Sequence, residues 1–389
     1  MSQNQIFCKF ALIGDNLELK QNVTLEINNK GMILNIEYDD FREEIEISKE
    51  KNAFIMIPGF INSHIHIGDS FAKEIGFNQN LKDIVAPPNG IKHRLLQGAP
   101  KEIKVEGIKN AIREMVSTGI TCFVDFRERN IEGINLLNNT LKGFSINNLI
   151  FGRFSNPEEI ESIFKVADGI GLPSYHNISS KIKEIINFNK EKLKKKIACH
   201  CAELERDEDL INEMFNDGIV DIVIHGTHFI KKDLERLNKN KLSLVLCPRS
   251  NGYFGTGFPP ILNILKLKIP ISLGTDNVMA NNPDLFEEMR YFYRIARVLC
   301  NNDISVKISA KDILKMVTIN AARNFRIEKN LGSISKGKMA DFFLINLNDP
   351  NFYSINIDIN KIYPLIVQRT KSENVKKTYI KGEIVFERD

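Results

Sequence analysis

From about residue 58 to residue 276, short apolar segments alternate with longer stretches whose apolar residues recur at helical spacing. Eight of the apolar segments have the length of a buried strand: Gly59–His66, Ile120–Phe126, Asn148–Gly152, Ala167–Leu172, Ile197–Cys201, Asp221–His225, Leu242–Cys247 and Ile271–Asp276. Strands that alternate with helices are typical of a parallel sheet. Eight such units in succession predict an α/β fold of the (β/α)8 TIM type.

Three stretches are predicted to be helices. Glu102–Ser117 lies between the first two strands, and Leu285–Cys300 and Ala310–Arg323 follow the eighth strand. The first is followed by Thr118 and Gly119, a plausible end for a helix. These helices would cover the outside of the predicted barrel.

Both ends of the chain are rich in short strands instead. The predicted strands are Gln5–Ile13, Val23–Ile27, Met32–Tyr38, Phe54–Ile57, Asp341–Leu347, Ile362–Val367 and Val375–Phe386, the last with a turn at Lys381-Gly382. Because the two sets flank the barrel, we expect them to pack together into one small sheet domain. The predicted division is residues 1–57 with 332–389 for this composite domain, and 58–331 for the barrel.

Two histidines end the first barrel strand. Residues i and i+2 of a strand point to the same side, so His64 and His66 both face the barrel interior. Active sites of these barrels lie at the carboxyl ends of the strands. A pair of neutral imidazoles suits zinc or ferrous iron. An H-x-H pair alone is weak, because two core or solvated histidines would be the commoner case.

Four more polar residues fall at or just after other strand ends. His200 ends the fifth strand and can supply a third nitrogen ligand, while Glu203 follows in the loop above it. His225 ends the sixth strand, where it can hydrogen-bond a water or the substrate. Asp276 closes the eighth strand and can ligate a metal or take a proton. Each of them alone could be structural, but a structural role for the whole set is improbable.

Composition narrows the class of protein without naming the substrate. The 389 residues carry a formal net charge of +4, which is too small to argue for nucleic acid or an anionic membrane. No apolar run reaches membrane-spanning length, and the first 20 residues do not resemble a secretory signal. The six cysteines include no C-x-x-C pair, so reduced thiols in a cytoplasm are the simplest interpretation.

The ordered motifs resemble the amidohydrolase superfamily. They are P-G-F-I-N before H-x-H at 58–66, H-x-x-E at 200–203, the strand-six histidine at 225, G-T-D at 274–276, and G-S-I-x-x-G-K-x-A-D at 332–341. Residues 332–341 match the last motif at every fixed position. The resemblance covers nearly the whole chain and is strongest to the cytosine deaminase, S-adenosylhomocysteine deaminase and triazine hydrolase branch. It implies that the N- and C-terminal segments form a small β-sandwich domain beside the barrel. It also implies a small-molecule substrate, and a homodimer would be unsurprising.

The resemblance also implies roles for the residues of these motifs. His64, His66, His200 and Asp276 match metal ligands, Glu203 matches the proton shuttle, and His225 matches the second catalytic histidine. The fourth strand offers no lysine that could bridge two metals after carbamylation, so one divalent ion per chain, Zn²⁺ or Fe²⁺, is expected.

Hydrolytic deamination of an amino-substituted nitrogen heterocycle, similar to a nucleobase, nucleoside or pterin, is the leading hypothesis for function. Two alternatives stay open. One is ring or amide hydrolysis of a cyclic substrate of the imidazolone type. The other is a catalytically idle barrel that serves as a scaffold.

Two features depart from the family pattern or lie outside it. Gly252-Tyr253 replaces the S-N-L-x-L continuation of nucleoside deaminases, which puts an adenosine-type substrate in doubt. Residues 68–94 are long for a first βα loop and could form a lid or part of the pocket. The substrate-contact candidates are His93, Arg127, Arg249 and Asn251.

Overall fold

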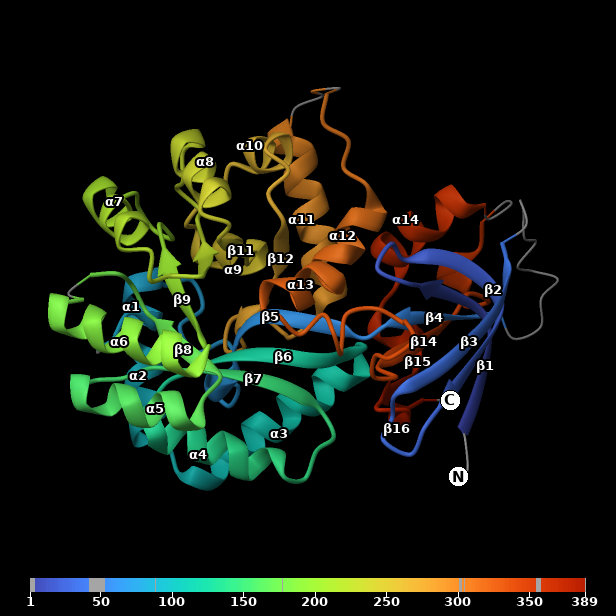
Figure 1. Cartoon of the computed structure of the whole chain (residues 1–389), viewed down its shortest axis with the longest axis horizontal. Coiled ribbons are helices and arrows are strands. Elements are labelled where there is room, and N and C mark those ends of the chain that lie inside the picture. The colour runs from blue at the N-terminus through green and yellow to red at the C-terminus, as the bar shows by residue number, and fades with distance from the viewer. Residues whose placement is uncertain are drawn as a thin grey trace.

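A computed structural model of the chain describes residues 4–41, 53–87, 89–176, 178–300, 303, 305–354 and 358–388. It places a barrel beside a separate sheet built from both ends of the chain (Figure 1). The barrel strands are β5 (Phe60–His66), β6 (Ile120–Arg127), β7 (Asn147–Gly152), β8 (Gly169–Leu172), β9 (Lys196–Cys201), β10 (Ile222–His225), β11 (Ser243–Leu246), β12 (Ile271–Leu273) and β13 (Asp276–Asn277).

The barrel closes through an interruption in its eighth strand. The parallel sheet has the order β12-β11-β10-β9-β8-β7-β6-β5-β13, so its two edges are consecutive pieces of chain separated by Gly274 and Thr275. The Asn62 side chain of β5 spans this gap. Its amide nitrogen donates to Thr275 Oγ1 at 2.7 Å, and its oxygen accepts from the Thr275 amide at 3.1 Å. The predicted eight-stranded barrel is therefore confirmed, with β12 and β13 together as the eighth strand.

Helices cover the outside of the barrel. Those after β5 are α1 (Leu81–Val85), α2 (Ile91–Gly98) and α3 (Lys101–Ser117), preceded by the 3₁₀ turn η2 (Ile67–Asp69). The others are α4 (Asn130–Leu141), α5 (Ile160–Val166) after η3 (Pro157–Glu159), α6 (Ser180–Leu193), α7 (Glu208–Asp217), α8 (Lys231–Lys239), α9 (Pro248–Phe254), α10 (Ile261–Lys266), α11 (Leu285–Cys300), α12 (Ala310–Met316) and α13 (Ile319–Asn324). The single predicted helix over 310–323 is thus two helices.

Local sequence explains where such a helix begins and ends. In α7, the Asp207 carboxylate accepts a hydrogen bond from the Leu210 amide at 3.0 Å, which caps the first turn. Gly218 follows the last residue with a φ of 65°, a conformation that glycine adopts without steric cost. Ile211 and Phe215 lie four residues apart and are both buried, so this face packs on the barrel.

The second sheet has seven strands in the order β16-β15-β14-β4-β1-β2-β3. They are β1 (Asn4–Ile13), β2 (Glu18–Ile27), β3 (Ile33–Asp40), β4 (Phe54–Pro58), β14 (Phe342–Asn346), β15 (Val375–Ile380) and β16 (Glu383–Glu387), with η4 (Pro350–Phe352) and η5 (Ser372–Asn374) between the last of them. The antiparallel pairing of β14 with β4 joins the two ends of the chain. A sheet built from both termini is confirmed, whereas the domain boundaries at 57/58 and 331/332 stay a prediction.

One predicted strand is wrong. Residues 362–367 lie inside helix α14 (Ile359–Arg369). The buried residues Ile362 and Ile366 are four apart, which is helical spacing, and the Asp358 carboxylate caps the first turn by accepting from the amides of Asn360 and Lys361. The run of apolar and β-branched residues suggested a strand, but its burial follows the helical period.

Among the described residues, no helix has the length and apolar character that crossing a bilayer requires.

Candidate metal centre

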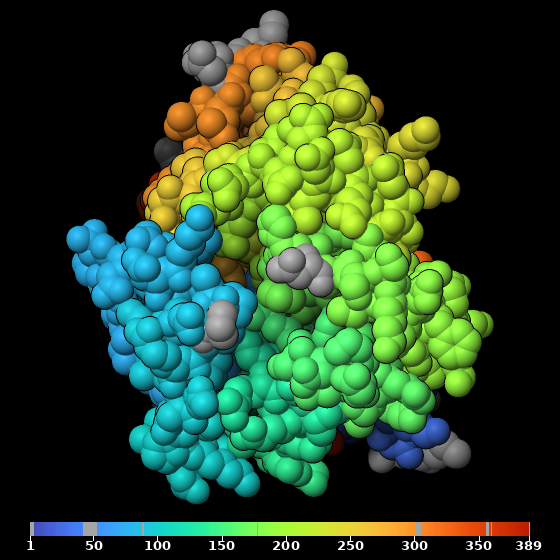
Figure 2. All heavy atoms as spheres, turned by 90° about the vertical axis from the view of Figure 1, so that its left-hand side faces the viewer, coloured from blue at the N-terminus to red at the C-terminus, as the bar shows by residue number. Residues whose placement is uncertain are grey.

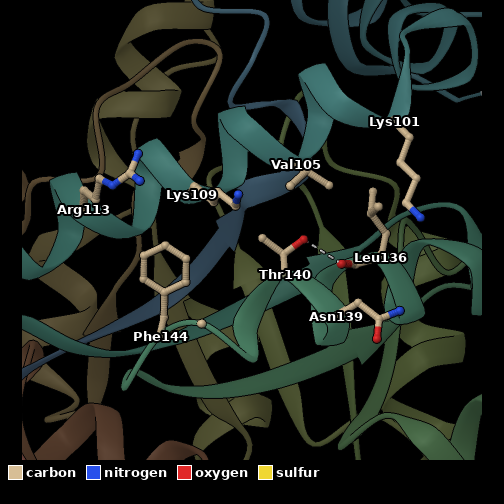
Figure 3. Close-up of a pocket in the computed structure, with 9 residues that line it drawn as sticks. Lys101, Val105, Lys109, Arg113, Leu136, Asn139, Thr140 and Phe144 are labelled. Atoms are coloured by element: carbon tan, nitrogen blue, oxygen red, sulfur yellow. Dashed lines mark hydrogen bonds between the residues drawn. The ribbon is translucent and has the colours of Figure 1, made fainter.

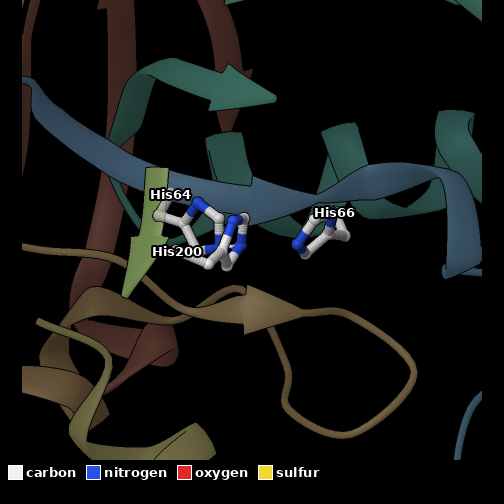
Figure 4. Close-up of side chains that lie close together, drawn as sticks. All are labelled: His64, His66 and His200. Atoms are coloured by element: carbon white, nitrogen blue, oxygen red, sulfur yellow. Dashed lines mark hydrogen bonds between the residues drawn. The ribbon is translucent and has the colours of Figure 1, made fainter. Parts of the chain in front are cut away.

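The first strand of the barrel presents two histidines to the interior. His64 and His66 project from the same side of β5 toward His200, which comes from β9 (Figure 4). All three rings are buried. Their ligand-type nitrogens lie within 4.8 Å of one another, and His64, His225 and Asp276 form a second, overlapping group of the same kind. Strand ends that are far apart in sequence therefore meet at one point.

The spacing of these atoms fits a bound metal ion. His64 Nε2 lies 3.3 Å from His200 Nε2 and 3.2 Å from Asp276 Oδ1, and His66 Nε2 lies 3.5 Å from the same oxygen. For metal–nitrogen bonds of about 2.0–2.1 Å, the ligand atoms of a tetrahedron are about 3.3 Å apart. Three imidazole nitrogens and one carboxylate oxygen at these separations can hold a divalent ion.

Hydrogen bonds to the main chain set the chemical form of two of the rings. His200 Nδ1 lies 3.0 Å from the Leu172 carbonyl, and His66 Nδ1 lies 2.9 Å from the Phe126 carbonyl. Each Nδ1 must donate to its carbonyl, so each Nε2 is left with a free lone pair. Burial lowers the pKa of His66 and His200, and it lowers the pKa of His64 to about 3. All three are therefore neutral near pH 7, as metal ligands must be.

Asp276 is held in place from both sides. Ser250 Oγ donates to its Oδ2 at 2.5 Å, and Asn277 Nδ2 donates to its Oδ1 at 2.9 Å. Burial would raise the pKa of Asp276, but the His64 ring in contact with it, together with His225 and His66, brings that pKa well below its usual value. The carboxylate is consequently ionised and fixed in orientation.

A second pair of residues faces the same point. Glu203 follows β9 in a loop, and its Oε1 lies 3.5 Å from His225 Nε2 at the end of β10. The His225 ring is 1% exposed, yet neither of its nitrogens has a hydrogen-bond partner among the described residues. Burial raises the pKa of Glu203, and the neighbouring His225 opposes that rise only in part. An acid with a raised pKa beside an unsatisfied imidazole is suited to proton transfer.

These side chains line one cavity of about 170 Å³. Its floor contains His66, His200, Glu203, His225 and Asp276. Its opposite wall is formed by α1 and the residues that follow it: Leu81, Lys82, Val85, Ala86 and Pro87. Viewed from the side of the molecule that carries α1, α2 and α6, a hollow opens between the blue segment of α1 and α2 and the green segments (Figure 2).

A more open groove of about 590 Å³ adjoins this cavity. The two share Pro87, Arg153 and Pro173 as lining residues. The groove is rich in polar side chains, among them His93, Glu128, Arg129, Asn130 and Glu159. The cavity at the histidines therefore opens into this polar groove.

The candidate substrate contacts lie outside the cavity. His93 lines the adjoining groove, and its Nε2 lies 3.1 Å from the Val85 carbonyl. Arg127 is buried and lies 3.5 Å from the Asp125 carboxylate. Its guanidinium also covers Gly68, where a β-carbon would come within 2.4 Å of Arg127 Nη2.

Arg249 and Asn251 make internal bonds. The Arg249 guanidinium donates to the carbonyl oxygens of Asn282 and Asp284 and pairs with Glu287 at 3.0 Å. Asn251 is buried, and its amide donates to the hydroxyls of Thr227 and Thr256 at 2.9 Å each. Their predicted substrate contact stays a prediction, and these bonds favour a structural role for both.

Several partners of the centre escaped the sequence-based prediction. Glu128 Oε1 lies 2.8 Å from His66 Nδ1 and 2.5 Å from Lys92 Nζ, and both charged side chains are buried. Lys92 also donates to Asn277 Oδ1 at 2.8 Å. Glu128 could have been suspected, because it follows the end of β6 directly. Nothing in the sequence singles out Lys92.

A groove of about 490 Å³ lies elsewhere, between α3 and α4 (Figure 3). Lys101, Lys109 and Arg113 of α3 line it together with Leu136 and Phe144. It contains no histidine or acid that could ligate a metal or transfer a proton. The groove therefore does not compete with the histidine cluster as the catalytic site.

Comparison with known proteins agrees with this geometry. An uncharacterized protein of Methanocaldococcus jannaschii is 34% identical over 367 residues, which cover 89% of this chain and 91% of the relative. A 5-methylthioadenosine/S-adenosylhomocysteine deaminase of Caldicellulosiruptor saccharolyticus is 27% identical over 418 residues, which cover 97% and 91%.

Among solved structures, an adenosine deaminase of Xanthomonas campestris with bound zinc superposes with a TM-score of 0.82 at 17% identity, over 98% of this chain and 92% of that one. The amidohydrolase family model matches residues 55–385. The resemblance predicted from the motifs is confirmed, and the chain belongs to the amidohydrolase family.

Proposed function

We propose that this protein is a metal-dependent hydrolase that deaminates an amino-substituted nitrogen heterocycle. The observation that carries the proposal is the convergence of His64, His66, His200 and Asp276 on one point, with the Glu203–His225 pair facing the same cavity. The Caldicellulosiruptor saccharolyticus relative is a 5-methylthioadenosine/S-adenosylhomocysteine deaminase, which agrees with the proposal.

One zinc or iron(II) ion per chain would be held by His64, His66, His200 and Asp276. When bound, a divalent ion acts as a Lewis acid and makes water a nucleophile near neutral pH. Zinc is supported by the zinc-containing structure with the same fold. The donor set of three imidazoles and a carboxylate suits either metal.

The chain's own residues would supply the proton transfers. Asp276 is ionised and can accept the proton of the attacking water. Glu203, with its raised pKa, can protonate a ring nitrogen of the substrate, which makes the adjacent carbon electrophilic. His225 is buried, and neither of its ring nitrogens is bonded to another described residue, so it can donate a hydrogen bond to the oxygen that adds. When the tetrahedral adduct collapses, Asp276 would pass its proton to the amino group, which leaves as ammonia, and Glu203 would recover a proton from the hydroxyl group that becomes the carbonyl.

The shape of the site favours a ring that carries a polar substituent. A cavity of about 170 Å³ encloses the reacting groups and has room for little more than a heterocyclic ring. The groove beyond Pro87, Arg153 and Pro173 is larger and polar, so it can receive a sugar-like or charged extension. A nucleoside-like substrate therefore fits better than a free base.

The test begins with elemental analysis of protein purified without added metal, beside His64→Ala. We expect about one zinc or iron per chain in the wild type and a large loss in the variant. Ammonia release is then screened over aminated purines, nucleosides, pyrimidines and pterins. Absence of bound metal in the wild type, with no uptake on reconstitution, would refute the metal-dependent mechanism. A metal-containing protein that opens the ring of a substrate without releasing ammonia would indicate ring hydrolysis instead.

A further inference from the structure

Helices α1 and α2 form part of the cavity at the metal centre. Leu81 and Val85 of α1 and Lys92 of α2 line it together with His66 and His200. The enclosed volume of about 170 Å³ is below the range of about 300–1,000 Å³ that ligand pockets usually span. Because α1 and α2 supply Leu81, Lys82, Val85 and Lys92 to this lining, an outward movement of the two helices would widen the cavity.

The apolar contacts of α1 are separate from the core of the barrel. Leu81 and Ile84 pack with Ala72, Phe254, Met279 and Ala280 in a small cluster of their own. Elements that bury little apolar surface, and none of it in the main core, open locally at a lower free energy than the rest of the fold.

The two helices are tightly joined to each other. Gly90, which precedes α2, packs so closely on α1 that a β-carbon there would lie 2.7 Å from the Ile84 carbonyl and 2.8 Å from that of Ala86. Because of this contact, α1 and α2 are expected to move as one unit.

One buried lysine ties this unit to the centre. Lys92 lies in the first turn of α2 and is 2% exposed. Its ammonium lies 2.5 Å from Glu128 Oε1, 2.8 Å from Asn277 Oδ1 and 3.5 Å from Asp69 Oδ2. All three partners belong to the barrel: Glu128 directly follows β6, Asn277 lies in β13, and Asp69 lies in η2, which follows β5.

The same contacts lead to two members of the metal centre. Glu128 Oε1 is also 2.8 Å from His66 Nδ1. Asn277 accepts from Lys92 through its oxygen, and this bond turns its amide nitrogen toward Asp276 Oδ1, to which it donates. The position of α2 is thus coupled to the orientation of His66 and Asp276.

We propose that α1 and α2 form a lid over the metal centre and that Lys92 is its latch, a positioning residue that docks the closed lid on Glu128, Asn277 and Asp69. The neutral Lys92→Met variant loses the attraction to these groups and shifts the lid toward the open state. The proposal deepens the proposed function, since a lid implies a substrate that must be enclosed. Its tests do not depend on turnover, so failure of the deaminase hypothesis and failure of the latch are distinguishable.

The first experiment measures amide hydrogen exchange in the wild type, Lys92→Met and Lys73→Met. Lys73 is the matched control because it lies in the same segment between β5 and α3. Its side chain is 51% exposed and pairs with Glu114 at the surface. We expect amides of α1 and α2 to exchange at least tenfold faster in Lys92→Met, while those of β6 and β7 keep their wild-type rates. Lys73→Met should match the wild type throughout.

The second experiment measures the release of zinc from the zinc-loaded protein to excess dipicolinate. An open lid exposes the ion, so release should be at least tenfold faster in Lys92→Met and unchanged in Lys73→Met. A folded Lys92→Met protein with wild-type exchange in α1 and α2 and wild-type zinc release would overturn the proposal. So would acceleration that is equal in the lid and the barrel strands, because that result indicates a general loss of stability.

If Lys92→Met does not fold, the wild type alone still tests the lid. Its amides in α1 and α2 must exchange through a local opening, at a lower free energy than those of β6 and β7. If they exchange only with global unfolding, the lid does not open on its own and the proposal fails. Lys92→Arg supplies a second variant, in which the longer side chain should hold α2 away from the barrel and give an intermediate exchange rate.

Discussion

Replacing Gly274 by alanine would test whether close packing of the first and eighth strands holds the candidate metal centre together. Gly274 lies in the break between β12 and β13, where the chain passes β5. A β-carbon built there would lie 2.6 Å from both Cβ and N of His64 and 2.8 Å from its carbonyl oxygen. Since non-bonded carbons settle about 3.5–4.0 Å apart, the two strands would have to separate by roughly 1 Å.

The size of this shift sets the expected effects. Forcing an extra methyl into a packed interior costs about 1–3 kcal/mol of unfolding free energy. Metal–ligand distances tolerate deviations of only about 0.2 Å, so a shift of this size moves His64 out of reach of a site that it shares with Asp276 and His200. We therefore expect zinc affinity to fall by about 10–100-fold or more, the range seen when the groups that orient ligands are lost.

The assay combines zinc competition against chelators of graded affinity with urea unfolding of the metal-free protein. Gly143→Ala is the matched control, because a β-carbon there would meet nothing within 4 Å. That variant should stay within about 0.5 kcal/mol of the wild type, as surface substitutions usually do. A Gly274→Ala protein with wild-type zinc affinity and stability would refute the conclusion that this contact positions His64.

Three further predictions concern the acid, the arginine and the pH dependence. Glu203→Gln should lower kcat, measured by ammonia release, by about 10²–10⁴-fold and leave the metal content, measured by elemental analysis, unchanged; activity within threefold of the wild type would contradict a role for Glu203 in proton transfer. Arg249→Met should lower the free energy of unfolding by about 1–3 kcal/mol with KM unchanged, because the side chain ties helix α9 to the carbonyl oxygens of Asn282 and Asp284; a raised KM at wild-type stability would restore the predicted substrate contact. Burial lowers the pKa of His64 from 6.5 to about 3, so between these pH values the unfolded chain binds a proton that the native state refuses. The metal-free protein should therefore lose stability as pH falls through this window, by about 1.4 kcal/mol per pH unit for His64, and urea midpoints that do not fall between pH 6.5 and pH 4 would contradict it.

The positions of the central site residues could be predicted from sequence because strand geometry is local. The i, i+2 rule places His64 and His66 on one face of a strand, and the barrel brings the carboxyl ends of all strands to one rim. His200 and Asp276 needed only the further expectation that they end strands five and eight. The structure brings these four residues together, as their positions at the strand ends predict.

The supporting residues could not be predicted, because their partners are set by tertiary structure. Lys92 reaches Glu128 and Asn277 from a helix of the first βα segment, across 36 and 185 positions in sequence. No periodicity marks a lysine that points inward from a short helix. A buried cation is recognisable only once its carboxylate and amide partners are in place.

The misassigned segment 362–367 shows the limit of residue preference. β-Branched and aromatic residues favour a strand, yet preference is weak next to burial. The spacing of Ile362 and Ile366 gives a helix one buried face, and the Asp358 cap fixes where that helix begins.

Backbone strain at the strand ends argues against an idle scaffold. His225 and Asp276 have φ values of 71° and 62°, and Ala202, beside Glu203, has 49°. Residues other than glycine enter this left-handed region at a cost of roughly 1–2 kcal/mol each. Strain of this kind persists where the surrounding structure over-determines it, and it gathers at functional sites. Here the strain coincides with the His225 imidazole, whose two buried nitrogens have no hydrogen-bond partner among the described residues. This is a second cost, which selection for the shape of the barrel alone does not explain.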